Sequence, residues 1–360
     1  MKTTVKLFTA LMLFSTLTPV LAQDAAAPAA APAAGRRGGG RGAGQTEWYL
    51  NKPPGGPSAY KAPNQPIWRL ADLLEAHAGQ NNWSQLIVRD NESDATYNSA
   101  APGTTITPRM HPDTPTAFIV VRGQMRFTVV GHDPVIAKRG SIIHILKTDV
   151  YSYEVLPGEN ALWLEYNVLG YTTLYPATGE KPPALPGAPV VKVVFPKPNV
   201  SYEPGNVLAF NTLDGIAACN TNDYSFTDQH MYMHLILGYA NPADNKCPGG
   251  RGGRGGGEGD DVAPGGGRGG RGGVAPAAYD SSVPFGHLHS GAVEWWLVQV
   301  GGIDAKFENY PEMHAVEGDV IYAAPMTWHQ MGDEGPGPSV RLAFGGYQRI
   351  NMNNTGPAAP

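Results

Sequence analysis

Apolar residues follow a helical period in one stretch near the beginning of the chain. Within "QPIWRLADLLEAHAGQ", one face of a helix would carry Ile67, Leu70, Ala71 and Leu74. A proline precedes these positions and a glycine follows them, as is common at helix ends. The stretch therefore predicts one short amphipathic helix.

The remaining apolar residues form short runs rich in β-branched and aromatic side chains, separated by Gly, Pro, Asn and Asp. Runs of this kind, bounded by turn formers and without helical patterns between them, indicate an all-β sandwich or barrel. The predicted strands include SQLIVRD, TAFIVVRG, QMRFTVV, SIIHIL, ALWLEYNV, VVKVVF, MYMHLILGY, VEWWLVQV, AKFENY and VRLAFGGY.

This strand pattern occurs twice. "TPRMHPDTPTAFIVVRGQMRF" and the later "GSIIHILKTDVYSYEV" run parallel to "FGHLHSGAVEWWLVQVGGIDAKF" and "GDVIYAAPMTWHQM". Two glycine pairs fix the alignment, because Gly123 matches Gly301 and Gly140 matches Gly318. The repeat predicts an internal duplication with one β-domain in each half of the 360-residue chain.

The first residues, "MKTTVKLFTALMLFSTLTPVLAQD", combine two lysines, an apolar run and small residues before Ala22. This is the composition of a secretory signal peptide, and the run is too short for a membrane span. We expect cleavage near Ala22 and a secreted or periplasmic protein. A second long apolar stretch is absent from the sequence, so no membrane partner is expected.

Two low-complexity stretches, 25–44 and 248–278, hold 21 of the 46 glycines, and we expect both to be disordered. The second stretch, 248–278, has the arginine and glycine content of an RGG-type nucleic-acid segment. Glu258, Asp260 and Asp261 lie in its middle, and the whole chain carries a formal net charge of -5. A flexible insertion is therefore favoured, and no nucleic-acid partner is expected.

The expected organisation combines these segments. It consists of a signal peptide (1–22), a disordered linker (23–46), an N-terminal β-domain (47–200), a C-terminal β-domain (201–352) interrupted by the insertion (248–278), and a tail (353–360).

Cys219 and Cys247 are the two cysteines of the chain. Neither lies beside a histidine or in a Cys-x-x-Cys pair, which disfavours a catalytic thiol. In an oxidising compartment a disulfide between them is favoured over two free thiols.

Four residues with metal-binding side chains occur in the second half. His287 and His289 share one face of an extended strand, whereas Glu294 has the wrong parity for that face unless the strand bulges, for example at Ser290-Gly291, or turns between them. A third imidazole, His329, follows the strand and turn "GDVIYAAPMTWH". Three imidazoles and one carboxylate can bind a divalent metal and leave positions open for water or substrate.

These residues resemble the motifs of the cupin superfamily. "HLHSGAVEWWLVQVGG" is similar to the first cupin motif, and "GDVIYAAPMTWH" to the second, with Thr327 in place of the turn glycine. The resemblance covers both halves and implies two jelly-roll barrels, that is, a secreted bicupin. It implies His287, His289, Glu294 and His329 as ligands of one divalent transition metal, with iron, manganese, copper, nickel and zinc left open.

The first half has lost this ligand set. Its residues at the four matched positions are Arg109, His111, Thr116 and Tyr151. One imidazole cannot hold a metal, and a guanidinium opposes one. We expect a metal-free N-terminal domain, as a scaffold rather than an anion or sugar pocket.

The other histidines are expected to be core or surface residues without partners at metal spacing. They are His77, His132, His144, His230, His234 and His314. Core packing accounts for the tryptophans beside the ligands, Trp295, Trp296 and Trp328. Candidates for a general acid or base are Tyr322, His314 and Glu312, without a choice among them.

The resemblance implies a metal-dependent oxidoreductase of the dioxygenase type, acting on a small organic substrate. One intact and one degenerate lobe also occurs in ring-cleaving bicupin dioxygenases. The run Glu294-Trp295 resembles the oxalate-acting group, so decarboxylase chemistry stays open, as do sugar isomerisation and metal or small-molecule binding without turnover. The oligomeric state, including a homo-oligomer, is left open.

Overall fold

The computed structural model of the chain describes residues 50, 52, 59–179, 182, 184, 186–220, 225–227, 231–247, 286–290, 293–345 and 352–353. The expected signal peptide, linker and insertion lie outside these residues, and so does the expected tail apart from Asn353. None of the described helices is long and apolar enough to cross a membrane.

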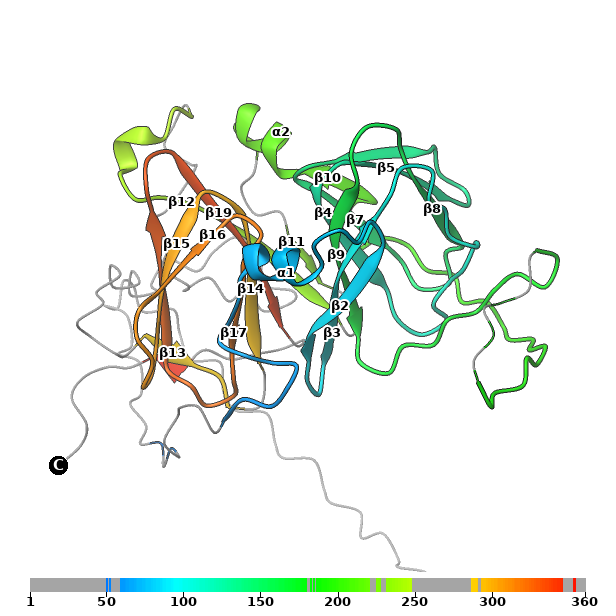
Figure 1. Cartoon of the computed structure of the whole chain (residues 1–360), viewed down its shortest axis with the longest axis horizontal. Coiled ribbons are helices and arrows are strands. Elements are labelled where there is room, and N and C mark those ends of the chain that lie inside the picture. The colour runs from blue at the N-terminus through cyan, green and yellow to red at the C-terminus, as the bar shows by residue number, and fades with distance from the viewer. Residues whose placement is uncertain are drawn as a thin grey trace, which may run out of the picture. The chain divides into compact units, whose positions relative to one another are not determined.

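The described residues form two lobes built almost entirely of strands (Figure 1). The N-terminal lobe has a six-stranded sheet in the order β10-β7-β4-β9-β3-β2 and a three-stranded sheet, β6-β5-β8. Its strands are β2 (Trp83–Arg89), β3 (Ser93–Ala100), β4 (Thr116–Arg122), β5 (Gln124–Val129), β6 (Val135–Lys138), β7 (Ser141–Ile145), β8 (Tyr151–Val155), β9 (Ala161–Val168) and β10 (Ala209–Asn211).

The C-terminal lobe repeats this plan with a six-stranded sheet, β1-β17-β14-β19-β12-β11, and a five-stranded sheet, β16-β15-β18-β13-β20. Its strands are β1 (Ile67–Trp68), β11 (Ser225–Thr227), β12 (Tyr232–Tyr239), β13 (His287–Leu288), β14 (Glu294–Val300), β15 (Gly302–Phe307), β16 (Met313–Val316), β17 (Val320–Ala323), β18 (His329–Glu334), β19 (Pro338–Gly345) and β20 (Met352–Asn353). The all-β, two-barrel fold predicted from the sequence is thereby confirmed.

Within the described residues, the strands are accompanied by the helices α1 (Leu70–Ala76) and α2 (Thr212–Ala217) and by the 3-10 turn η2 (Pro242–Asp244). The predicted amphipathic helix is α1, but Ile67 precedes it and lies in β1 instead. Leu70 and Leu73 are buried in a core that also contains residues of both six-stranded sheets. The apolar face of α1 therefore packs where the two lobes meet.

Each lobe receives one short strand from beyond its own sequence range. β1 precedes the N-terminal lobe in sequence but pairs with β17, with Ile67 opposite Ile321. β10 follows the N-terminal lobe and returns to pair with β7, with Phe210 opposite Ile142. β1 thus lies in the sequence range expected for the N-terminal domain (47–200) and β10 in the range expected for the C-terminal domain (201–352), so each lobe holds a strand from the other's expected range.

The internal duplication is visible in the backbone. The matched glycines adopt the same left-handed conformation, with φ of 72° at Gly123 and 69° at Gly301. The β-bulge between Val120 and Arg122 recurs between Val298 and Val300, at the same offset in sequence. The two halves therefore share strand register and turn geometry as well as their hydrophobic pattern.

One predicted strand is wrong. The run VVKVVF (190–195) forms no strand, and Val190 and Val194 are 66% and 101% exposed. Prolines at 189, 196 and 198 cannot donate a backbone hydrogen bond, so the run has little capacity to join a sheet despite its β-branched residues. Conversely, β3 is a strand that the sequence pattern does not predict. Its sequence SDATYNSA is largely polar, but the strand forms because both of its edges pair, one with β2 and one with β9.

The structure joins Cys219 and Cys247 in a disulfide, as the sequence favoured. Cys219 follows α2, and Cys247 follows η2. The bridge thus closes the segment that contains β12 of the C-terminal lobe.

Candidate metal centre

Two different sheets supply the side chains of the candidate metal centre. His287 lies on β13 and pairs with His329 at the start of β18, within the five-stranded sheet. Glu294 begins β14 in the six-stranded sheet, where it lies opposite Ala323 and Gly345. The chain changes sheets between His289 and Glu294, so the parity rule for a single strand does not apply. The possible bulge at Ser290-Gly291 lies partly outside the described residues, which end at Ser290 before this gap.

The three imidazoles and the carboxylate converge on one point. The Oε2 atom of Glu294 lies 2.8 Å from Nε2 of His289, 3.3 Å from Nε2 of His329 and 3.5 Å from Nε2 of His287. The Nε2 atoms of His287 and His329 are 3.0 Å apart. Four donor atoms at these separations fit around a small cation with bonds of about 2.0–2.2 Å.

The burial and hydrogen bonding of these four side chains fit a cluster with a bound cation better than a cluster without one. Each of the four residues is at most 4% exposed, and buried carboxylates are normally paired or bound to metal. The Nδ1 atom of His329 donates to the carbonyl oxygen of Thr327 at 2.9 Å, which leaves a lone pair on Nε2. The donor set, its spacing and this second hydrogen bond all fit a divalent transition metal.

Aromatic side chains surround the inner side of the cluster. Trp296 meets the ring of His329 edge to face at 5.2 Å, and Phe307 lies 6.0 Å from it. Both belong to the apolar core of the C-terminal barrel. Trp295 points to the opposite face of β14 and stacks on Phe344 at 3.9 Å, in the core between the lobes. Trp296 thus borders the cluster, whereas Trp295 does not.

The turn before His329 has Thr327 at the position where the motif has a glycine, and a different residue adopts the left-handed conformation. Thr327 is buried, and the left-handed residue is its neighbour Met326, with φ of 62°. The backbone N–H of Met326 donates to the carbonyl oxygen of His289 at 2.8 Å. The turn therefore connects two of the ligand-bearing segments directly.

The N-terminal lobe has the same backbone but different side chains. Arg109 and Tyr151 pair across strands as His287 and His329 do. His111 donates from Nδ1 to the carbonyl oxygen of Thr172, and its Nε2 accepts from the hydroxyl of Tyr151, both at 3.0 Å.

These contacts occupy the one imidazole of the lobe. Burial lowers the pKa of His111, the hydrogen bond to Thr172 raises it, and the Arg109 charge lowers it further. Arg109 itself lies over the ring of Tyr175. Among the described residues of this lobe, no group of three metal-binding side chains comes together.

The candidate acids and bases lie away from the metal centre. Tyr322 points into the core between the lobes, because its neighbour Ala323 faces the C-terminal barrel interior. Glu312 immediately precedes β16 and is partly exposed. His314 lies on the outside of β16, with 62% of its side chain exposed.

His314 also differs from the expectation that it lacks metal-spaced partners. The structure brings its Nδ1 to the carboxylates of Asp304 and Glu334. These residues are ten and twenty positions apart from it, on different strands, so no local motif shows the cluster. The signal available in the sequence is the hairpin formed by β15 and β16, whose register places Asp304 opposite His314.

The remaining histidines have ordinary packing roles where they are described. His77 stacks on Trp83, His132 and His144 contact Tyr202, and His234 contacts Tyr232. His230 lies outside the described residues.

Comparisons with known proteins return solved structures only. No protein-family profile matches the chain, and no curated protein matches its sequence. Salicylate 1,2-dioxygenase from Pseudaminobacter salicylatoxidans aligns at 10% identity and a TM-score of 0.48, over 78% of this chain and 83% of that one. A mutant of oxalate decarboxylase from Bacillus subtilis aligns at 10% identity and 0.41, over 82% and 81%. A cupin 2 conserved barrel domain protein from Leptotrichia buccalis aligns at 10% identity and 0.42, over 77% and 94%.

The duplicated strand order and the position of the His-x-His, Glu and His side chains define a double-barrel, cupin-type fold. One lobe carries a buried cluster that can hold a metal ion, and the other carries a hydrogen-bonded substitute for it.

Proposed function

We propose that the chain is a metal-dependent oxidoreductase of the dioxygenase type, which acts on a small organic substrate in the C-terminal barrel. The observation that carries this proposal is the convergence of His287, His289, Glu294 and His329 within one buried cluster. A divalent metal bound there would supply a Lewis acid for an oxygen atom of the substrate, and a redox-active ion such as iron or manganese would also supply electrons to O2.

The chain's own residues define what surrounds such a reaction. Glu294 offsets part of the metal charge, and the carbonyl oxygen of Thr327 holds the ring of His329 in one orientation. Trp296 and Phe307 keep the inner side of the cluster dry, which strengthens electrostatic interactions there. These features support chemistry at the metal over a purely structural ion.

Only the C-terminal lobe keeps the four metal-binding side chains, and this difference between the lobes supports an oxidoreductase over a decarboxylase. One intact and one degenerate lobe resembles the arrangement in ring-cleaving double cupins. The sequence feature that favoured oxalate-type chemistry was the run Glu294-Trp295, but Trp295 packs on Phe344 in the core between the lobes. The side chain of Trp295 is therefore not part of the metal centre.

We also propose that the protein is exported. The apolar leader and the Cys219–Cys247 disulfide support this, since disulfides persist in oxidising compartments.

Oxygen uptake and carbon dioxide release, measured in parallel on metal-loaded protein with a panel of small aromatic and aliphatic acids, test the reaction type. The proposal expects oxygen consumption that is lost in His289→Ala and kept in His132→Ala, a matched change at an exposed histidine of the other lobe. Carbon dioxide release without oxygen uptake would favour the decarboxylase. Equal conversion by the native protein and His289→Ala would exclude catalysis at this site.

A further inference from the structure

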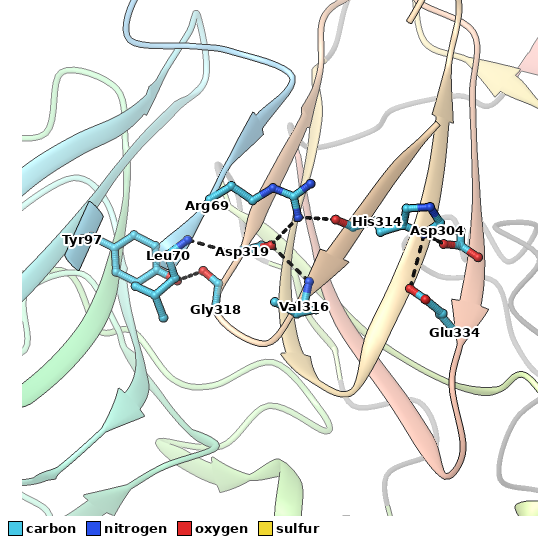
Figure 2. A network of polar contacts seen from close by, with 9 residues as sticks. All are labelled: Arg69, Leu70, Tyr97, Asp304, His314, Val316, Gly318, Asp319 and Glu334. Atoms are coloured by element: carbon cyan, nitrogen blue, oxygen red, sulfur yellow. Dashed lines mark hydrogen bonds and ion pairs between the residues drawn. The ribbon is translucent and has the colours of Figure 1, made fainter. Parts of the chain in front are cut away.

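A second cluster of metal-binding side chains lies on the outer face of the C-terminal lobe. It consists of Asp304 on β15, His314 on β16 and Glu334 at the end of β18 (Figure 2). Asp304 and His314 are direct cross-strand partners. Glu334 lies opposite Gly302, two positions from Asp304 and therefore on the same face of the sheet.

The three side chains turn toward one another. Nδ1 of His314 is hydrogen-bonded to Oδ1 of Asp304, and Oε2 of Glu334 lies 3.6 Å from the same nitrogen. One ligand atom from each residue lies within 4.8 Å of the others.

The backbone beneath the imidazole is held by the segment that joins β1 to α1. The guanidinium of Arg69 donates to the carbonyl oxygen of His314 and, at 2.9 Å, to Oδ2 of Asp319 (Figure 2). Asp319 in turn accepts from the backbone N–H of Leu70 at 2.9 Å and of Val316 at 3.1 Å. Three paired strands and this network hold the cluster in place, so an ion would meet preorganised ligands.

The cupin-type fold does not require these residues. In the N-terminal lobe the matched positions hold Arg126, Ile136 and Leu156, in the same strand register. Ile136 is 49% exposed, so the outer face tolerates an apolar side chain where His314 stands. The ligand set is thus a property of the C-terminal lobe alone.

We propose that Asp304, His314 and Glu334 bind a divalent transition-metal ion of the zinc class at a second site, separate from the buried cluster. Two carboxylates and one imidazole match the mixed nitrogen and oxygen ligands that zinc accepts, and a water molecule would complete four-coordination. The two carboxylate charges balance the charge of the ion. Calcium and magnesium prefer oxygen ligands only and bind such a site less well.

Zinc stoichiometry of the full chain separates the two sites. Equilibrium dialysis against zinc followed by elemental analysis should find two ions per native chain. His314→Ile, which installs the residue of the other lobe, should bind one ion, and so should His289→Ala, which disables the buried cluster. His132→Asn, a change at an exposed histidine, should keep both ions. One ion in the native chain and the same one ion in His314→Ile would overturn the proposal, whatever happens in His289→Ala.

Glu334→Gln tests the third ligand with almost no change of shape. Replacing a carboxylate ligand should weaken the second zinc by at least about tenfold, since even changes behind the ligands commonly cost that much. Unchanged affinity in Glu334→Gln would contradict a three-residue site. Circular dichroism melting of each variant shows whether the fold is kept, as expected for exposed positions.

Discussion

His287 and His329 face each other across neighbouring strands with their Nε2 atoms 3.0 Å apart. His329 donates its Nδ1 proton to the carbonyl oxygen of Thr327, so its Nε2 presents a lone pair toward His287 and Glu294. A cation between these atoms resolves an arrangement that would otherwise leave buried lone pairs facing one another. In the other lobe, Arg109 and Tyr151 occupy the same pair of positions, and a hydrogen bond from Tyr151 to His111 replaces the ion.

Metal removal should destabilise the protein. A ligand that binds only the folded state adds about 2.7 kcal/mol at a free concentration one hundred times its Kd. Chelation should therefore lower the Tm of the native protein measurably. We ascribe most of this decrease in Tm to loss of metal from the buried cluster. His314→Ile, which keeps that cluster, should therefore show most of the decrease on chelation, and His289→Ala, which disables it, should show little. Equal decreases in the native protein and His289→Ala would contradict this.

Metal binding at the buried cluster should also weaken with acid. Imidazoles bind metal in their neutral form, so protons compete with the ion for the ligand nitrogens. Metal content after dialysis at a series of pH values should fall as the pH is lowered. A load that stays constant down to about pH 4.5 would argue against imidazole ligands.

His111 should make the N-terminal lobe sensitive to acid for a different reason. Burial lowers its pKa, so the unfolded chain takes up a proton at a higher pH than the folded chain does. The neutral, buried His111 therefore contributes fully to the free energy of unfolding above about pH 6.5, and this contribution is lost as the pH falls toward the pKa of the folded state. In that window the free energy of unfolding falls by at most about 1.4 kcal/mol per pH unit.

Urea unfolding of native protein and His111→Gln, both without metal, measures this contribution. The native protein should lose more stability than the variant between pH 7.5 and pH 5. If the free energies of unfolding of native protein and His111→Gln changed with pH in parallel, His111 would have the same pKa in the folded and unfolded states, and the prediction would be wrong.

The Cys219–Cys247 bridge should stabilise the folded protein chiefly by restricting the unfolded chain. For a loop of this length the effect is on the order of 3 kcal/mol. The double variant Cys219→Ser/Cys247→Ser should unfold at lower urea concentration and should no longer respond to reducing agent. Native protein with the same midpoint before and after reduction would count against a stabilising bridge.

The sequence predicted the parts of the fold that local patterns determine. The alignment on Gly123 and Gly301 correctly paired the strands of the two halves, and it matched His287 and His329 with Arg109 and Tyr151. This worked because a duplicated barrel keeps its turns and bulges where the backbone requires them.

Relationships between distant segments were beyond such patterns. The pairing of β1 with β17 depends on contacts between segments about 250 positions apart, as does the bond from Arg69 to Asp319. The sequence leaves open whether the chain bulges or turns before Glu294, and only the sheet pairings show that it crosses from one sheet to the other there. Tyr322 is a candidate acid or base because it lies near the strands of the second domain in sequence, yet strand alternation turns it away from the cluster.

Anomalous diffraction from crystals of metal-loaded protein, collected at the absorption edge of the metal, tests the central claim most directly. The account predicts one strong peak inside the C-terminal barrel, within about 2.3 Å of a donor atom from each of His287, His289, Glu294 and His329. It predicts no peak between Arg109, His111 and Tyr151. An empty C-terminal barrel, or a metal in the N-terminal barrel, would contradict it.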